Sequence, residues 1–101
     1  MGTAEKIKNK TKTNQEMKVP RLYKVILYND DFTTMDFVMK ILMTVFSKDT
    51  YEAYEIMMSI HNGSFAAVGL YPKDIARTKV AIVTSMAREE GFPLKIEAIP
   101  E

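Results

Sequence analysis

The stretch that decides the fold is Tyr23-Lys24-Val25-Ile26-Leu27-Tyr28-Asn29-Asp30-Asp31-Phe32-Thr33-Thr34-Met35. Residues 22–28 are mostly apolar, β-branched or aromatic, which predicts a strand. The apolar run stops at Asn29-Asp30-Asp31. Thr34 then offers an N-cap hydroxyl for a helix that has Asp36 in its first turn. We therefore expect a short polar loop between a rigid strand and a rigid helix.

The rest of the chain alternates between helical and strand patterns. Apolar residues recur at helical spacing in three segments, and two further segments are typical of strands. The expected elements after the loop are a helix through Phe46, a helix that restarts at Ser47 and Asp49 and ends at Asn62-Gly63, a strand over 64–71 with a close approach at Gly69, a helix from Pro72 to Gly91, and a strand over 94–99. The order β-α-α-β-α-β predicts a single-domain, two-layer α/β sandwich, with a three-stranded antiparallel sheet and the helices on one face.

The length of the chain allows one domain, and its first twenty residues are not expected to join it. They are rich in Lys, Thr, Asn and Gln, and their few apolar side chains cannot offset the entropy cost of ordering. We therefore expect a flexible N-terminal arm over residues 1–20 and a core domain over residues 21–101. On composition the arm is either a solvating tail or a segment that engages a partner.

Charge and cysteine content exclude several classes of function. The formal net charge is +1 and the chain has no cysteine, which argues against a nucleic-acid-binding domain, a disulfide framework and a thiolate zinc site. The apolar runs are too short to span a bilayer, and the N-terminus lacks the apolar core of a secretory signal. We expect a cytoplasmic protein that needs no metal or cofactor and has neither nucleic acid nor membrane as a partner.

The polar loop and the only histidine, His61, supply groups that suit a small cation. An α-ammonium group carries three N–H donors, and its removal from water is costly unless each donor finds an acceptor. The carboxamide of Asn29, the carboxylates of Asp30 and Asp31 and a neutral imidazole are such acceptors. Apolar residues of the first two helices would stand beside them, namely Met35, Val38, Met57 and Ile60. This combination would recognise a free N-terminus that bears a large apolar residue.

Each of these features also has a simpler explanation. A polar turn after a strand commonly has solvated carboxylates, and a histidine near a helix C-terminus is favourable with the helix dipole. The methionines can be core residues, although eight in this chain is a high number and methionine is over-used at adaptable binding surfaces. Composition and spacing alone stop at a small α/β domain with a candidate cation-binding corner.

The motif Tyr23-Lys24-Val25-Ile26-Leu27-x-Asn29-Asp30-Asp31-Phe32-Thr33-x-Met35-x-Phe37-Val38 resembles the ClpS family. Members of that family are adaptors that deliver N-degron substrates to the ClpA AAA+ unfoldase of the ClpAP protease. The resemblance covers nearly the whole chain after the arm and continues through Met57-x-x-Ile60-His61, Gly69, Ala76-x-Thr78-Lys79-Val80-Ala81 and Pro93-Leu94.

This resemblance implies an adaptor, not an enzyme, that binds a free N-terminal Leu, Phe, Tyr or Trp and delivers the substrate to ClpA for degradation by ClpAP. It implies that Asn29, Asp30 and His61 contact the α-amino group, with Asp31 close by. The pocket for the first side chain would be lined by Thr33, Met35, Val38, Met57, Ile60 and Leu94, with Met35 as the gatekeeper that crowds out Ile and Val.

The resemblance also implies a second surface and a role for the arm. Asp74 and Lys79 match the face that docks on the N-terminal domain of ClpA, and the arm would act in handing over the substrate. Two residues depart from the family pattern, Thr34 where Pro is frequent and Phe32 where Tyr or His is frequent. These departures leave the α-amino contacts intact but put the fine specificity among the four bulky residues in question.

Three other classes of protein compete with this interpretation. An enzyme could use Asp30, Asp31 and His61 for acid–base catalysis, but the chain has no nucleophile elbow or phosphate-cradling glycine loop. The lysine-rich arm suggests a nucleic-acid module, but residues 21–101 lack a basic stripe with interleaved aromatics. A domain like that of the translation stalk would share this type of fold without the Asn-Asp-Asp loop and the histidine.

Overall fold

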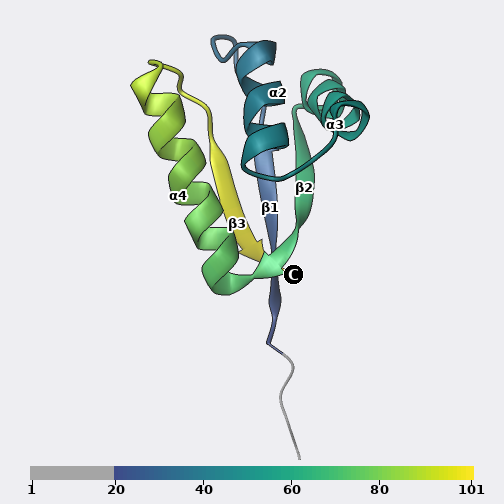
Figure 1. Ribbon diagram of the computed structural model, residues 1–101, viewed down its shortest axis with the longest axis vertical. Helices are drawn as coiled ribbons and strands as arrows, with labels where there is room; N and C mark the ends of the chain where they lie inside the picture. Colours follow the sequence, from purple (N-terminus) through teal and green to yellow (C-terminus); the bar gives the residue numbers. More distant parts are fainter. Residues whose placement is uncertain (1–19) are drawn as a thin grey trace, which may run out of the picture.

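The computed structural model describes residues 20–101, so the predicted arm lies outside the described residues except for Pro20. Figure 1 shows the strands side by side with the helices packed against them. The elements are β1 (Leu22–Tyr28), α2 (Met35–Thr44), α3 (Thr50–Gly63), β2 (Phe65–Pro72), α4 (Lys73–Glu89) and β3 (Ile96–Pro100). The predicted order β-α-α-β-α-β is confirmed.

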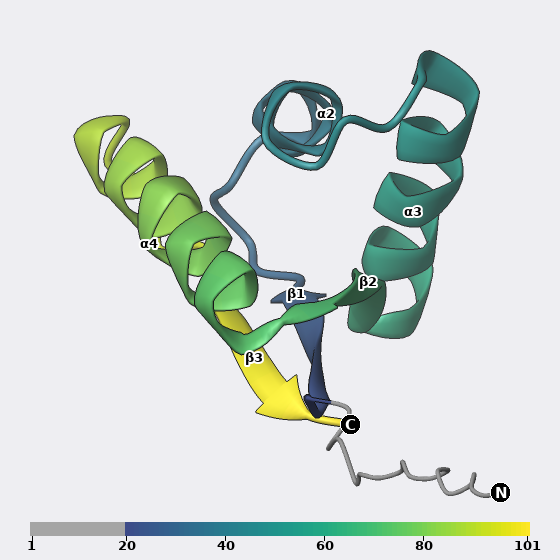
Figure 2. The same cartoon turned by 60° about the horizontal axis from the view of Figure 1, so that its bottom comes forward.

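The sheet is antiparallel and has the order β2-β1-β3, so the first strand of the chain is its centre. Val25 of β1, for example, pairs with Gly69 of β2 on one side and with Ala98 of β3 on the other. The helices cover one face of the sheet (Figure 2), which gives the predicted two-layer sandwich. Val25, Ile26 and Leu27 are all buried, so the middle of this central strand is shielded on both faces, in agreement with its nearly continuous apolar sequence.

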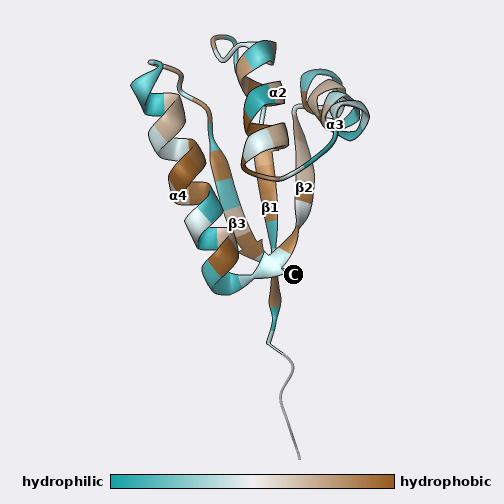
Figure 3. Ribbon diagram, viewed as in Figure 1, coloured by the Kyte–Doolittle hydropathy of each residue, from teal (hydrophilic) through white to brown (hydrophobic). Residues whose placement is uncertain are grey.

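The core lies between the sheet and the helices and follows the two periodicities seen in the sequence. Val25 and Leu27, two residues apart on β1, are fully buried, as are Ile41 and Leu42 on α2. Figure 3 shows the apolar middle of β1 and the mixed polar and apolar turns of α4. Each fully buried aliphatic side chain of this kind contributes about 1.5–3 kcal/mol to folding.

Short polar side chains begin α2 and α3. The hydroxyl of Thr34 accepts a hydrogen bond from the backbone N–H of Phe37 at 3.1 Å, which is the N-cap that the sequence predicts. The carboxylate of Asp49 accepts a hydrogen bond from the backbone N–H of Glu52 at 2.8 Å and caps the N-terminus of α3. Because Thr34 supplies a genuine cap, the absence of the family's frequent Pro does not leave the start of α2 uncapped.

Helix α3 ends at Gly63, as predicted, and the left-handed residue that follows it is Ser64, with φ of 78°. The Ser64 carbonyl accepts a hydrogen bond of 2.7 Å from the backbone N–H of Asn29 at the end of β1. This bond places the last turns of α3 beside the start of the polar loop. Gly91, with φ of 80°, follows α4 as expected.

The remaining predicted backbone features concern β2 and α4. The pairing of β1 with β2 shifts between Val25 and Ile26, next to Gly69, and a Cβ at Gly69 would lie 3.0 Å from the Tyr71 hydroxyl oxygen. The predicted close approach at Gly69 is therefore confirmed. Pro72 stands just before the first residue of α4 and provides no side-chain cap. None of the helices in residues 20–101 combines the length and apolarity needed to span a bilayer.

Candidate functional site

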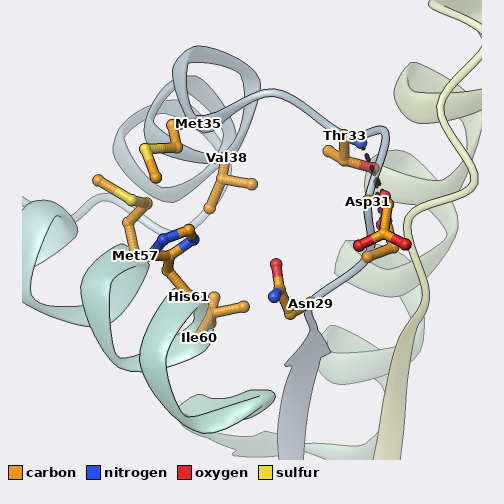
Figure 4. Close-up of a pocket in the computed structure, with 9 residues that line it drawn as sticks. Asn29, Asp31, Thr33, Met35, Val38, Met57, Ile60 and His61 are labelled. Carbon is orange, nitrogen blue, oxygen red and sulfur yellow. Dashed lines mark hydrogen bonds between the residues drawn. The ribbon is translucent and has the colours of Figure 1, made fainter.

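A pocket of about 290 Å³ opens where the end of β1, the polar loop, the start of α2 and the end of α3 converge. Figure 4 shows its labelled side chains around a shared space. The residues that line it are Asn29, Asp30, Asp31, Thr33, Met35, Val38, Met57, Ile60 and His61. The structure thus brings together every predicted residue of the α-amino site and every predicted residue of the apolar pocket except Leu94.

Asn29, Asp31 and His61 form the polar side of the pocket. In Figure 4 the Asn29 side chain stands at the tip of β1, between the imidazole of His61 and the loop that carries Asp31. Within residues 20–101 these three side chains make no hydrogen bond, and all three residues are exposed. Their acceptor atoms are therefore available to a ligand that brings its own donors.

Asp30 differs from its neighbour because the loop already uses its carboxylate. One carboxylate oxygen accepts from the backbone N–H groups of Phe32 at 2.8 Å and Thr33 at 2.7 Å. The other accepts from the Thr33 hydroxyl at 2.8 Å. Burial raises the pKa of Asp30, but these bonds and the charge of Arg88 outweigh it and hold the pKa below its usual value. Asp30 therefore fixes the loop in its ionised form, and Asp31 presents the unengaged carboxylate.

The apolar side of the pocket comes from two helices. Val38 of α2 and Met57 and Ile60 of α3 are 7%, 6% and 4% exposed and form its floor. Met35, on the first turn of α2, is 44% exposed and stands at the opening, with its thioether close to that of Met57 in Figure 4. A pocket with one polar side and one apolar side can hold a charged head and an apolar side chain of the same ligand.

Two predicted pocket residues have roles that the sequence did not indicate. The side chain of Thr33 lines the pocket, but its hydroxyl is committed to Asp30. Leu94 does not line the pocket, which corrects the prediction for this residue. It is 2% exposed and belongs to the core, because the segment that links α4 to β3 turns its side chain inward. The Leu94 carbonyl is held there by the Arg88 guanidinium at 3.1 Å.

The predicted docking residues Asp74 and Lys79 lie together at the other end of α2. They line a shallow depression of about 460 Å³ with Thr44, Val45, Ile75, Thr78 and Ile82. The sequence analysis missed these five residues. Four of the seven, Ile75, Thr78, Lys79 and Ile82, recur at three- and four-residue spacing on α4, and this spacing was the signal that could have identified the face.

The ammonium group of Lys79 is engaged within the described chain. It donates a hydrogen bond of 2.7 Å to the carbonyl of Val45, at the C-terminus of α2. It also lies 5.6 Å from the ring centre of Phe46 and 5.4 Å from that of Tyr71. A cation at this place is favoured both by the helix dipole and by the aromatic faces. Lys79 thus ties α4 to the end of α2.

The described residues offer no arrangement for a metal ion. No group of three or more His, Cys, Asp or Glu side chains in residues 20–101 is placed to hold one. What the pocket does present is a set of hydrogen-bond acceptors beside apolar walls. Its chemistry is that of a binding site for a cationic, partly apolar group.

Comparisons with known proteins agree with this geometry. Residues 18–97 match the family model of the ATP-dependent Clp protease adaptor protein ClpS. A ClpS adapter protein of Acetivibrio thermocellus is 50% identical over 98 residues, which cover 97% of this chain and 99% of that protein. One of Deinococcus radiodurans is 44% identical and covers 93% of this chain and 83% of that protein.

A solved structure gives the same result at the level of the fold. The structure of Agrobacterium tumefaciens ClpS2 bound to L-phenylalaninamide superimposes with a TM-score of 0.79 and 40% sequence identity. The match covers 82% of this chain and all of that one. The β-α-α-β-α-β sandwich of this chain therefore matches the fold of a solved ClpS protein. The chain belongs to the ClpS family, the adaptor proteins of the ATP-dependent Clp protease.

Proposed function

We propose that this adaptor binds the free N-terminal residue of N-degron substrates, where that residue is Leu, Phe, Tyr or Trp, and delivers them to the ClpA unfoldase for degradation by ClpAP. One observation carries the proposal: acceptors without a hydrogen-bond partner in residues 20–101 and buried apolar side chains line the same small pocket. The solved relative bound to L-phenylalaninamide supports it, because that ligand has a free α-amino group and an aromatic side chain.

In this proposal the polar side of the pocket receives the α-ammonium group. The three N–H donors meet the Asn29 amide oxygen, the Asp31 carboxylate and the neutral imidazole of His61. Asp30 contributes a negative charge nearby, but its main role is to hold the loop through its bonds to Phe32 and Thr33. An acetylated or internal residue has no ammonium group and would leave these acceptors unpaired.

The first side chain of the substrate enters between α2 and α3. Burial of an aromatic side chain of about 150–250 Å² contributes roughly 4–6 kcal/mol at about 25 cal/mol per Å². Ordering of the peptide and loss of its free motion consume a comparable amount. The ammonium hydrogen bonds, at about 1.5–3 kcal/mol each, therefore provide much of the net affinity.

The depression at the other end of α2 is the proposed docking surface for the N-terminal domain of ClpA. It combines the exposed apolar side chains of Ile75 and Ile82 with the charges of Asp74 and Lys79. A surface with an apolar centre and charged edges suits contact with another protein. Because it lies away from the pocket, substrate and unfoldase can occupy the adaptor at the same time.

Titration of matched peptides tests the binding proposal. A labelled Phe-first peptide is compared with its N-acetylated form and with a Gly-first form of the same sequence, by fluorescence anisotropy. We expect acetylation to weaken binding at least about 100-fold, because two or more charge-assisted hydrogen bonds are lost. Equal affinity for the free and acetylated peptides would refute the ammonium site.

Delivery is tested separately with ClpAP and a Phe-first fluorescent reporter protein. The reporter should be degraded faster when the chain is added, and a Gly-first reporter should not. The same peptides incubated with the chain alone should be recovered unchanged. Hydrolysis or modification of the Phe-first peptide by the chain alone would support the enzyme alternative instead.

A further inference from the structure

Met35 lines the pocket and is the more exposed of the two methionines there. Met35 is 44% exposed, and Met57, which contributes the second thioether of the pocket, is only 6% exposed. Figure 4 shows both sulfur atoms on the same side of the cavity, to the left of Val38 in this view. An oxidant in solution therefore reaches Met35 first. Met43, on the same helix and 40% exposed, does not line the pocket.

Exposed thioethers react with peroxides in a balanced two-electron step. A lone pair of the sulfur attacks one oxygen of hydrogen peroxide, an S–O bond forms and the O–O bond breaks. The proton of the transferred oxygen moves to the leaving hydroxide, which departs as water. The sulfur is oxidised, the peroxide is reduced, and methionine sulfoxide reductases reverse the change with a thiol reductant.

We propose that Met35 is a reversible oxidation site whose sulfoxide closes the pocket to bulky apolar N-terminal residues. This inference rests on the proposed function of the pocket. A sulfoxide replaces a flexible apolar side chain with a polar and chiral one. When an apolar side chain enters the pocket, the sulfoxide oxygen loses its water. The neighbouring walls, formed by Val38 and Met57, offer it no hydrogen-bond donor.

The consequence is a site that stops selecting its substrates under oxidative conditions without unfolding. Met35 lies on the surface, so its oxidation does not put a polar atom into the core. Oxidation of a buried methionine such as Met57 would do so. The difference in exposure between the two residues makes the effect local, and removal of the oxygen restores the original surface.

The first experiment uses the full chain in its reduced form. Affinity for the Phe-first peptide is measured before and after a timed treatment with hydrogen peroxide, and the sulfoxides are located by mass spectrometry of proteolytic fragments. We expect affinity to fall at least about tenfold as Met35 is oxidised. Treatment with methionine sulfoxide reductases should restore it. Saturating peptide should also slow the oxidation of Met35, but not that of Met43.

Two variants separate Met35 from the other methionines. Met43→Leu should lose as much affinity on oxidation as the natural chain. Met35→Leu, whose own affinity before treatment serves as its reference, should lose none when Met43 is oxidised and the buried Met57 is not. An equal loss in Met35→Leu would overturn the proposal. Full affinity of the natural chain with Met35 completely oxidised would also overturn it.

A partition experiment gives the answer even if Met35→Leu does not fold. Partly oxidised natural chain is passed over an immobilised Phe-first peptide, and the sulfoxides are compared between the bound and unbound fractions. The Met35 sulfoxide should be depleted from the bound fraction, and the Met43 sulfoxide should be evenly distributed. An even distribution of both would refute the oxidation site alone. Failure of the reduced chain to bind the peptide would refute the proposed function itself.

Discussion

The two ends of helix α2 present two different surfaces, and the difference lies in how their polar groups are used. At its N-terminal end, Asn29, Asp31 and His61 face the pocket and make no hydrogen bond within residues 20–101. At its C-terminal end, the charge of Lys79 is already bound to the Val45 carbonyl. Polar groups without an internal partner suit a ligand with its own donors, and engaged groups stabilise the domain.

The apolar residues of the two surfaces differ in their exposure to solvent. Val38, Met57 and Ile60 form the buried floor of the pocket, whereas Ile75 and Ile82 of α4 are 47% and 44% exposed. A pocket with a buried floor accepts a single inserted side chain. Exposed isoleucines on a helix instead suit the flat surface of a second protein.

Removal of the Asp31 carboxylate should weaken binding of the Phe-first peptide by about 10- to 100-fold, because one charge-assisted hydrogen bond of about 1.5–3 kcal/mol is lost. Asp31→Ala is compared with Asp36→Ala, which removes an exposed carboxylate that does not line the pocket. Calorimetric titration gives both affinities. If Asp31→Ala binds as tightly as Asp36→Ala, the carboxylate that meets the ammonium is not Asp31.

Loss of the His61 imidazole should weaken binding of the Phe-first peptide at least about tenfold, because one charge-assisted hydrogen bond to the ammonium group is lost. His61→Ala removes the acceptor, and calorimetric titration compares its affinity with that of the natural chain. His61→Gln keeps an acceptor and should retain more of the affinity than His61→Ala. Unaltered affinity in His61→Ala would show that the imidazole does not meet the ammonium group.

Truncation of Met35 should change the selectivity of the pocket. Met35→Ala enlarges the opening, and we expect the affinity for Ile-first and Val-first peptides to rise roughly tenfold relative to the Phe-first peptide. Competition assays with the three peptides measure the change, and Met43→Ala serves as the control on the same helix. Continued rejection of Ile and Val by Met35→Ala would show that crowding by this side chain does not exclude them.

Loss of the Lys79 ammonium should lower the free energy of unfolding by about 1 kcal/mol, because the Val45 carbonyl loses its donor. Lys79→Met keeps the apolar stem, and urea denaturation measures the effect. The same variant should bind the N-terminal domain of ClpA more weakly and the Phe-first peptide with unchanged affinity. A comparable loss of peptide affinity would mean that the two ends of α2 are coupled.

The contribution of Asp30 to the stability of the fold should depend on pH. Its pKa is lowered in the folded chain, so its stabilising contribution is present above its unfolded pKa of about 3.9 and is lost as the pH falls through the lower folded value. Asp30→Ala should therefore be less stable than the natural chain by roughly 0.5–1 kcal/mol near neutral pH. The difference should shrink below about pH 4. A difference that persists in strong acid would contradict an electrostatic origin.

Local patterns were enough to predict the order of the elements and most of their ends. The apolar run of β1 and the helical spacing on α2 and α3 require no knowledge of distant contacts, and Thr34 caps its helix through a local bond. The hydrogen bond between the Asn29 N–H and the Ser64 carbonyl could not be predicted, because it joins residues that lie far apart in the sequence. The resemblance implied that Leu94 lines the pocket, whereas in the structure its side chain is buried in the core.

The two aspartates of the loop also differ in a way that the sequence did not predict. The sequence presents Asp30 and Asp31 as equivalent neighbours, and the resemblance implied that Asp30 contacts the amino group. The structure distinguishes them through three hydrogen bonds that only Asp30 receives. Such bonds depend on backbone directions in the loop, which residue identity alone does not fix.

Neighbouring residues along the chain were enough to predict the strand–loop–helix unit and the residue types that can hold a cation. The bonds that distinguish Asp30 from Asp31 are also local, but they depend on backbone directions in the loop that residue identity does not fix. The placement of His61 opposite Asn29 depends on tertiary contacts, because the bond between the Ser64 carbonyl and the Asn29 N–H brings residues of β1 and α3 together. Packing and long-range hydrogen bonds settle which segments meet, because they act between residues that lie far apart in the sequence.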